Sequence, residues 1–189
     1  MIPNHFIADN LTNMDGYTWT LPSRLGSLLQ EAQTRFGPRD LSYTILGIEF
    51  GPNNPRIWYP NSRKDIIVQL SQAALNDNIL ALYQLAHECI HLLSPSGQAI
   101  ATTLEEGLAT VFSEDYVERE FQRTDITDLQ SYRDAAQLVR QLIMVKPDAI
   151  MQLRSIQPSF SAMTQEHFTT VCPQADAPLV HSLLMPFAR

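Results

Sequence analysis

The sequence predicts an α+β fold, with a small β-sheet in the first third of the chain and helices over most of the remainder. Between residues 41 and 70, short runs rich in β-branched and aromatic residues alternate with turn-forming residues, which is typical of strands. From about residue 74 onward, apolar residues recur at helical spacing instead. The chain has 189 residues, of which 44% are hydrophobic, so it is long enough to bury one substantial core.

We therefore expect a single domain over residues 1–189, built from three subregions. Residues 1–73 are expected to form a helix and the sheet, residues 74–122 a central pair of helices, and residues 123–189 a helical remainder. The sequence contains no internal repeat, low-complexity segment or long linker that would divide it further.

The first subregion begins with residues 1–20, where turn formers and a lack of periodicity predict irregular structure. A helix is expected over residues 22–36, because Pro22 suits a first helical turn, leucines recur at helical spacing, and Gly37 and Pro38 end the pattern. Three strands are expected to follow, over residues 41–50, 56–59 and 65–70.

The rest of the chain is expected to be helical. The helix over residues 74–93 is apolar on nearly every side, as expected for a helix buried in the middle of a domain. A cluster of charges at residues 114–120 predicts a solvated end for the next helix. The predicted helices cover residues 74–93, 98–122, 126–145, 147–156, 164–171 and 177–187.

The buried helix over residues 74–93 contains the pentapeptide H-E-C-I-H at residues 87–91. Residues four apart lie one above the other on a helix, so His87 and His91 offer two imidazole nitrogens to one metal ion. Glu88 is rotated about 100° around the axis, where its carboxylate reaches a water on that metal. The alternative is a buried helix with two incidental histidines, which the scarcity of histidine disfavours, since the chain contains five.

A third metal ligand is expected at Glu106, because catalytic zinc sites typically use three protein ligands and leave one position for water. Turn formers at residues 94–97 allow a loop, after which a second helix returns beside the first. Glu105 is the rival ligand, but it is expected to point to a different side of that helix. For Glu106 the alternative is an ordinary solvated glutamate. The residues on its own face are small and permit close approach: Thr102, Thr103, Ala109, Thr110 and Ser113.

The H-E-x-x-H motif followed by E-G-L-A at residues 106–109 resembles the gluzincins, zinc metallopeptidases whose third ligand is a glutamate on the next helix. The E-G-L-A stretch is similar to the sequence around that ligand in the aminopeptidase branch. The resemblance covers about thirty residues and implies a zincin-like core, in which a small sheet packs on the active-site helix. It also implies that His87, His91 and Glu106 bind Zn²⁺ and that Glu88 is the general base.

The resemblance also has departures, and it suggests where a substrate would bind. The thermolysin branch has an aspartate four residues after its glutamate ligand, as a partner for a histidine. Here that position is Thr110, so the partner must come from elsewhere. No aminopeptidase-type motif precedes the histidines, so the resemblance does not carry exopeptidase activity over, and an endopeptidase is the expected class. In such folds an edge strand pairs with an extended peptide. The segment 56–59 has prolines on both sides and suits either this edge or an ordinary buried hairpin strand.

The expected reaction is zinc-dependent hydrolysis of a peptide bond. Zinc lowers the pKa of its water from ~15.7 toward ~7, and Glu88 takes the proton as that water attacks. One further donor is usually wanted for the oxyanion; the candidates are Tyr116, Tyr132, His167 and His181, each with a packing or surface role as its alternative. Two other functions remain open, namely a catalytically inactive zincin-fold binding or regulatory module and a metal-dependent hydrolase of a non-peptide substrate.

The net charge and the cysteine content limit the expected partners and cellular compartment of the protein. A net charge of −7 and a pI near 5.1 argue against nucleic acid and against an anionic membrane, which leaves a peptide or protein as the expected partner. Neither a signal peptide nor a membrane-spanning run is visible, so a cytoplasmic protein is expected. Cys89 is turned away from the metal face and is expected in the core, and a disulfide with Cys172 has no support.

Overall fold

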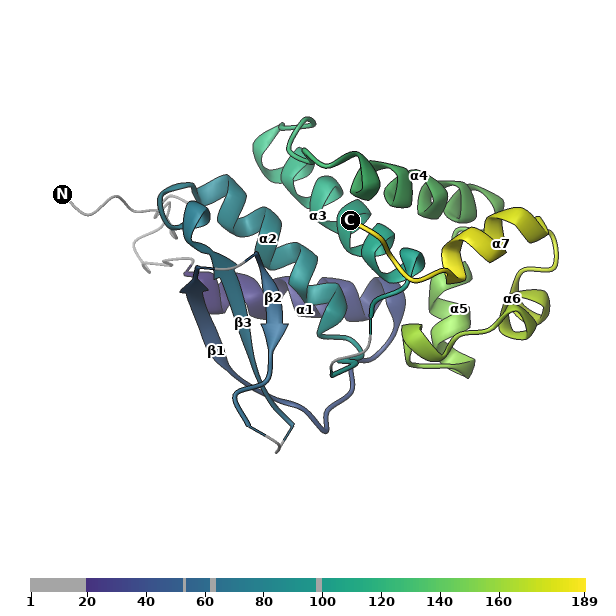
Figure 1. The fold of residues 1–189 in the computed structure, drawn as a ribbon, viewed down its shortest axis with the longest axis horizontal. Coiled ribbons are helices and arrows are strands. Elements are labelled where there is room, and N and C mark those ends of the chain that lie inside the picture. The colour runs from purple at the N-terminus through teal and green to yellow at the C-terminus, as the bar shows by residue number, and fades with distance from the viewer. Residues whose placement is uncertain (1–19, 53, 62–63, 98–99) are drawn as a thin grey trace, which may run out of the picture.

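A computed structural model describes residues 20–52, 54–61, 64–97 and 100–189. Within these ranges the protein is α+β, with one three-stranded sheet and seven α-helices, so the predicted fold class is confirmed at this level. Figure 1 shows the sheet on one side of helix α2 and the helices of the second half of the chain on the other side. Residues 1–19, which were expected to be irregular, lie outside the described residues.

Helix α1, Leu21–Phe36, confirms the helix predicted over residues 22–36. Thr20 and Ser23 form a reciprocal capping box, and Pro22 occupies the first turn, where its missing N–H costs nothing. The helix ends at Gly37, whose φ of +95° is readily adopted only by glycine. The buried stripe of α1 consists of Leu21, Arg24, Leu25, Leu28, Ala32 and Phe36.

The sheet has the strand order β1-β3-β2 and is formed by β1 (Thr44–Gly51), β2 (Arg56–Trp58) and β3 (Asp65–Ser71). Strand β1 runs parallel to the central strand β3, whereas β2 runs antiparallel to it. The alternate residues Ile66 and Val68 of β3 are fully buried, because this strand packs against the helices. Strand β2 lies at an edge of the sheet, which decides between the two alternatives for this segment in favour of the edge strand.

Helix α2, Asn78–His91, runs through the centre of the molecule and packs against α1, α3 and the sheet (Figure 1). A 3-10 turn over Gln72–Asn76 precedes it, so the predicted helix over residues 74–93 is confirmed in its body but not in its first turn. Asp77 caps the helix by accepting a hydrogen bond from the N–H of Leu80 at 2.9 Å. The α2 side chains between the sheet and α3 are almost completely buried, which fixes their positions.

Helix α3, Thr103–Phe121, begins later than the predicted residue 98. Residues 101–103 pair instead with residues 185–187, where the N–H of Phe187 donates to the carbonyl of Ala101 at 2.9 Å. Thr102 then caps the helix by accepting from the N–H of Glu105 at 3.3 Å. The first turn of α3 is therefore held in place by a segment more than eighty residues away along the chain.

Helix α4, Gln130–Val145, also begins later than predicted, since residues 126–129 were expected to be helical. Arg133 donates hydrogen bonds of 2.9 Å to the carbonyls of both Thr127 and Asp128, and this holds residues 126–129 outside the helix.

Helices α3 and α4 pack closely because Gly107 faces α4. A Cβ atom at Gly107 would lie 2.7 Å from the carbonyl carbon of Ala135, which is closer than packing allows.

The final helices complete the core. The predictions over residues 147–156 and 164–171 are confirmed by α5 and α6, whereas α7 ends before the predicted residue 187, because the residues after it are extended. The described cysteines, Cys89 and Cys172, are both buried and free, as expected for Cys89. No helix of the described residues is long and apolar enough to cross a membrane. The bounds are α5 Ala149–Ile156, a 3-10 turn Phe160–Ala162, α6 Gln165–Val171 and α7 Ala177–Leu184.

Candidate metal centre

Two imidazoles and one carboxylate converge where α2 packs against α3. His87 Nε2 lies 3.1 Å and His91 Nε2 lies 3.7 Å from the same atom, Oε2 of Glu106. One donor atom from each of the three residues lies within 4.8 Å of the other two. Helix α2 presents both histidines on one face, one turn apart, and the first turn of α3 presents the carboxylate. The structure therefore brings together the three ligands that the sequence predicts.

The spacing of these donors fits a tetrahedral metal ion. Metal–nitrogen and metal–oxygen bonds of about 2.0–2.1 Å place neighbouring ligand atoms of a tetrahedral zinc ion roughly 3.3 Å apart. The observed separations of 3.1 and 3.7 Å from Glu106 Oε2 lie on either side of that value. Two imidazoles with one carboxylate are a donor set that suits zinc, and three protein ligands leave a coordination position for water or substrate.

Glu105 has a role at the site that the sequence did not predict. It was weighed only as a rival ligand that points to a different side from Glu106, and its Oε1 lies 2.8 Å from Nδ1 of His91. The two nitrogens of an imidazole lie on different edges of the ring, so consecutive residues of α3 reach both of them. Glu105 thereby orients His91 so that its Nε2 atom faces Glu106. It supplies the carboxylate partner for a histidine that Thr110 cannot provide, since the Thr110 hydroxyl donates to the carbonyl of Glu106 instead. This carboxylate is buried, with 2% of its surface exposed.

The pKa values of His91 and Glu106 show that the carboxylates of this centre favour a positive charge between them. Burial lowers the pKa of His91, but the negative charges of Glu106 and Glu105 outweigh it and raise that pKa to about 10. Burial likewise raises the pKa of Glu106, but the nearby His91 and His87 outweigh it and lower that pKa to about 2. These shifts favour a protonated His91 beside the ionised carboxylate of Glu106, at the point where a metal ion would bind.

Glu88 lies beside the ligands on α2 without a protein partner for one of its oxygens. The side chain is 2% exposed, and its Oε2 atom accepts no hydrogen bond from the described residues. Burial raises the pKa of the Glu88 carboxyl above its usual range, and this effect outweighs the opposing influence of His91 and His87. A buried carboxylate with an unpartnered oxygen and a raised pKa is well suited to accept a proton.

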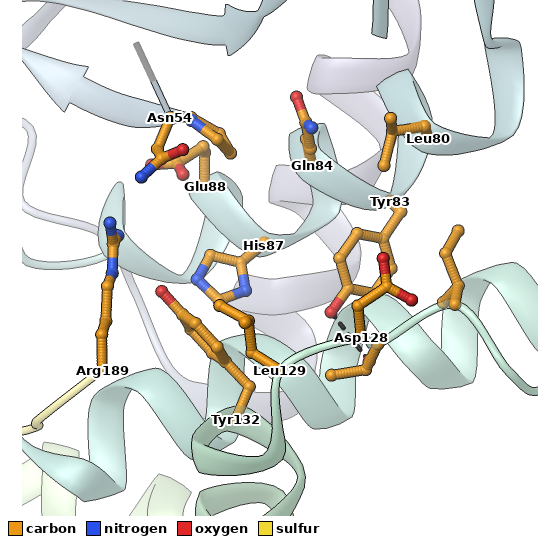
Figure 2. Close-up of a pocket in the computed structure, with 13 residues that line it drawn as sticks. Asn54, Leu80, Tyr83, Gln84, His87, Glu88, Asp128, Leu129, Tyr132 and Arg189 are labelled. Carbon is orange, nitrogen blue, oxygen red and sulfur yellow. Dashed lines mark hydrogen bonds between the residues drawn. The ribbon is translucent and has the colours of Figure 1, made fainter. Parts of the chain in front are cut away.

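Two cavities flank the centre. The first cavity, of about 200 Å³, opens beside His87 and Glu88 (Figure 2). The second cavity, of about 210 Å³, opens beside His91 and Glu106. The residues just before the edge strand β2 border the first cavity, and β2 itself borders the second. The apolar and aromatic part of the first cavity is formed by Pro55, Leu80, Tyr83, Ile126, Leu129 and Tyr132.

Of the four candidate donors for an oxyanion, Tyr132 is the one that the structure places at the centre. It lines the first cavity, and its ring contacts the ring of His87 edge-on at 5.7 Å between centroids. Tyr116 is 3% exposed in the core at the far end of α3. His167 belongs to the cap of α6, and His181 is exposed on α7. These three side chains do not line either cavity.

Comparisons with known proteins add no family to this description. No protein-family model matches the chain, and no curated protein or solved structure was found to be similar to it. The function of the centre therefore rests on its own donors, on the buried carboxylate of Glu88 and on the two cavities beside it.

Proposed function

We propose that this protein is a zinc-dependent peptidase of the gluzincin type with a zincin-like core. The observation that carries the proposal is the convergence of His87, His91 and Glu106 on one point, next to the buried and unpartnered carboxylate of Glu88. A purely structural metal site has four protein ligands and no need of a neighbouring base. Three ligands, a free carboxylate and an adjoining cavity are what hydrolysis by an activated water requires.

Each residue of the centre has a distinct task in the proposed reaction. Bound zinc supplies a Lewis acid that polarises the substrate carbonyl and lowers the pKa of a water to about 7. Glu88 takes the proton from the attacking water and returns it to the leaving amine. Glu105 holds His91 in the orientation that directs Nε2 toward Glu106. Tyr132, which lines the first cavity beside His87, is the proposed hydrogen-bond donor to the carbonyl oxygen as negative charge develops there.

The proposed substrate is an extended peptide that pairs with the edge strand β2. Within the described residues β2 pairs on one side only, with β3, so its outer edge is available for another strand. Asn54 and Pro55 border the first cavity, and Arg56 and Ile57 border the second. A peptide beside β2 would therefore pass both cavities and cross the metal centre between them.

The test is zinc-dependent cleavage of a peptide mixture, analysed by mass spectrometry of the new chain ends. Zinc-loaded wild-type protein is expected to cleave, and a chelator is expected to stop it. Glu88→Gln is expected to keep its zinc but to lose activity by about 100-fold or more, because it removes the general base. The control Glu118→Gln changes an exposed glutamate of α3 outside the centre and is expected to match wild type.

Two outcomes would contradict the proposal. Equal turnover by wild type and Glu88→Gln would remove Glu88 as the base. A wild-type protein that holds zinc but cleaves no peptide would favour the alternative of a zinc-binding module without peptidase activity.

A further inference from the structure

The chain segment after α7 returns to the metal centre and forms part of the wall of the first cavity. The carbonyl of Met185 accepts from the N–H of Thr103 at 2.9 Å, and the N–H of Phe187 donates to Ala101 at 2.9 Å. The ring of Phe187 then packs on Tyr132 with 4.8 Å between centroids. These contacts fix the segment 185–187 next to the first turn of α3 and bring the following residues to the cavity (Figures 1 and 2).

Arg189 is the cation that this segment brings to the cavity. It is the one lysine or arginine among the described residues that line the first cavity. Its guanidinium carbon lies 5.9 Å from the centre of the Tyr132 ring, and Figure 2 places it at the same end of the cavity as Glu88. Asp128 lies at the opposite end, next to Tyr83.

The guanidinium of Arg189 is exposed and has no carboxylate partner in the described part of the chain. Every other arginine within the described ranges bonds to a carboxylate, a carbonyl or an amide oxygen of the protein. Arg154, for example, donates to the carbonyls of Phe36, Gly37 and Pro38. Arg189 forms a side-chain hydrogen bond with the hydroxyl of Tyr132, and its other N–H donors stay available to a molecule in the cavity.

We infer that Arg189 is a specificity-determining residue that binds a carboxylate group of the substrate in the first cavity. This inference rests on the proposed peptidase function and names the class of peptide that the site would favour. The guanidinium fork matches a carboxylate with two parallel hydrogen bonds, which a neutral amide does not reproduce. The carboxylate has two sources in a peptide: the free carboxyl end of the chain, or an aspartate or glutamate side chain close to the scissile bond.

The negative charge of the centre does not oppose this assignment once the metal is bound. The cluster contains the carboxylates of Glu88, Glu105 and Glu106, which alone would repel an anionic group. The two positive charges of a zinc ion offset most of that charge, and Arg189 adds a further positive charge on the cavity side. A substrate carboxylate at this end of the cavity therefore meets no net repulsion from the cluster, and its direct bond to Arg189 decides its position.

The first test is a binding measurement that requires no turnover. The probes are the monohydroxamates of succinic, glutaric and adipic acid, whose hydroxamate binds zinc and whose other end is a free carboxylate. Each probe is compared with the matching compound in which a primary amide replaces the carboxylate. At the chain length that reaches Arg189, the zinc-loaded wild type is expected to bind the acid about tenfold or more tightly than the amide.

The variant Arg189→Gln is expected to reduce that acid-to-amide ratio to about one, because the glutamine has no charge to offer. Arg123→Gln is the matched control, since Arg123 is an exposed arginine that pairs with Asp125 at 3.2 Å outside the cavity. Raising the salt concentration is expected to weaken the preference, because screening acts on an exposed charge. Equal binding of acid and amide at every chain length would overturn the inference, and so would a preference that survives in Arg189→Gln.

The second test separates the two sources of the carboxylate and distinguishes this inference from the proposed function. Peptides that the wild type cleaves are compared with a free or an amidated carboxyl end, and with glutamate or glutamine beside the scissile bond. A preference for either acid assigns its source and is expected to be lost in Arg189→Gln. Cleavage that ignores both changes would overturn the role of Arg189 and leave the peptidase intact. A wild type that binds no zinc would instead overturn the proposed function, together with this inference.

Discussion

The pair of helices α2 and α3 and the cavity wall formed by residues 126–129 and by Arg189 border the same centre but are built differently. The helices hold their polar side chains by burial, since Glu88 and Glu105 are each 2% exposed. The wall is mostly exposed and is held by a few hydrogen bonds, such as that between the hydroxyls of Tyr83 and Thr127 at 2.9 Å. The difference suggests that the helix pair fixes the chemistry, whereas the wall governs what enters the cavity.

This contrast predicts that the largest losses of stability come from buried polar side chains that hold the end of α2 in the core. Arg154 is 3% exposed and donates to the carbonyls of Phe36, Gly37, Pro38, Leu93 and Pro158, so it ties the end of α1 to the end of α2. Arg154→Met keeps the length of the side chain but leaves these carbonyls without their donor. We expect the free energy of unfolding to fall by about 3 kcal/mol or more.

Urea unfolding of Arg154→Met beside wild type measures this loss. The exposed Arg123 provides the control as Arg123→Met, which is expected to change the free energy of unfolding by less than about 0.5 kcal/mol. A loss below about 1 kcal/mol in Arg154→Met would mean that the fold does not depend on this junction between α1 and α2.

The next effect concerns the metal rather than the fold. Glu105→Gln keeps the size of the side chain but removes the charge that orients His91 through its Nδ1 atom. We expect the zinc dissociation constant to rise by about 10- to 100-fold, as is typical when such a supporting carboxylate is lost. Competition against a chromogenic chelator measures it, with Glu118→Gln as the control on the same helix. An unchanged dissociation constant in Glu105→Gln would show that the orientation of His91 is set by packing alone.

The pH dependence of zinc binding follows from the same cluster. Near neutral pH the metal-free His91 is protonated, because its pKa is raised to about 10, whereas Glu106 is already ionised, because its pKa is lowered to about 2. Zinc must displace the His91 proton, so the affinity is expected to rise about tenfold per pH unit between roughly pH 6 and 9. Calorimetry in buffers of different ionisation enthalpy is expected to detect about one proton released per zinc. Binding without proton release would contradict this description of the metal-free centre.

The smallest effect is expected where the wall meets α2, at Tyr83. Tyr83→Phe removes the hydroxyl that bonds to Thr127, but Thr127 keeps its hydrogen bond to Glu114 at 2.7 Å. We expect the free energy of unfolding to fall by only about 0.5–1.5 kcal/mol. Zinc affinity is expected to stay at the wild-type value, while the Michaelis constant for a cleaved peptide changes. A loss of zinc affinity in Tyr83→Phe would show that the wall and the metal ligands are not independent.

The helix pair and the cavity wall also differ in how far their structure could be predicted from the sequence. Helix α2 and its ligands follow from local periodicity, because His87, Glu88 and His91 lie close together in sequence on a single helix. The central pair of helices and the edge position of the strand at residues 56–58 were also within reach of pattern and proline placement.

The missed features depend on contacts that no local pattern carries. The start of α3 is set by residues 185–187, which pair with residues 101–103 across most of the second half of the chain. The start of α4 depends on the side chain of Arg133, which donates hydrogen bonds to the backbone carbonyls of two residues before the helix. The role of Glu105 depends on which nitrogen of His91 it meets, and a helical wheel does not contain that information.

The zinc content of purified protein, measured by elemental analysis for wild type and Glu106→Ala side by side, tests the central claim most directly. We expect about one zinc per wild-type chain and a sharp loss in the variant, because two histidines alone leave the ion underbound. A far-ultraviolet circular dichroism spectrum of each protein confirms that both are folded. A wild type that takes up no zinc even when it is supplied, or a folded Glu106→Ala that keeps its zinc, would contradict the three-ligand centre.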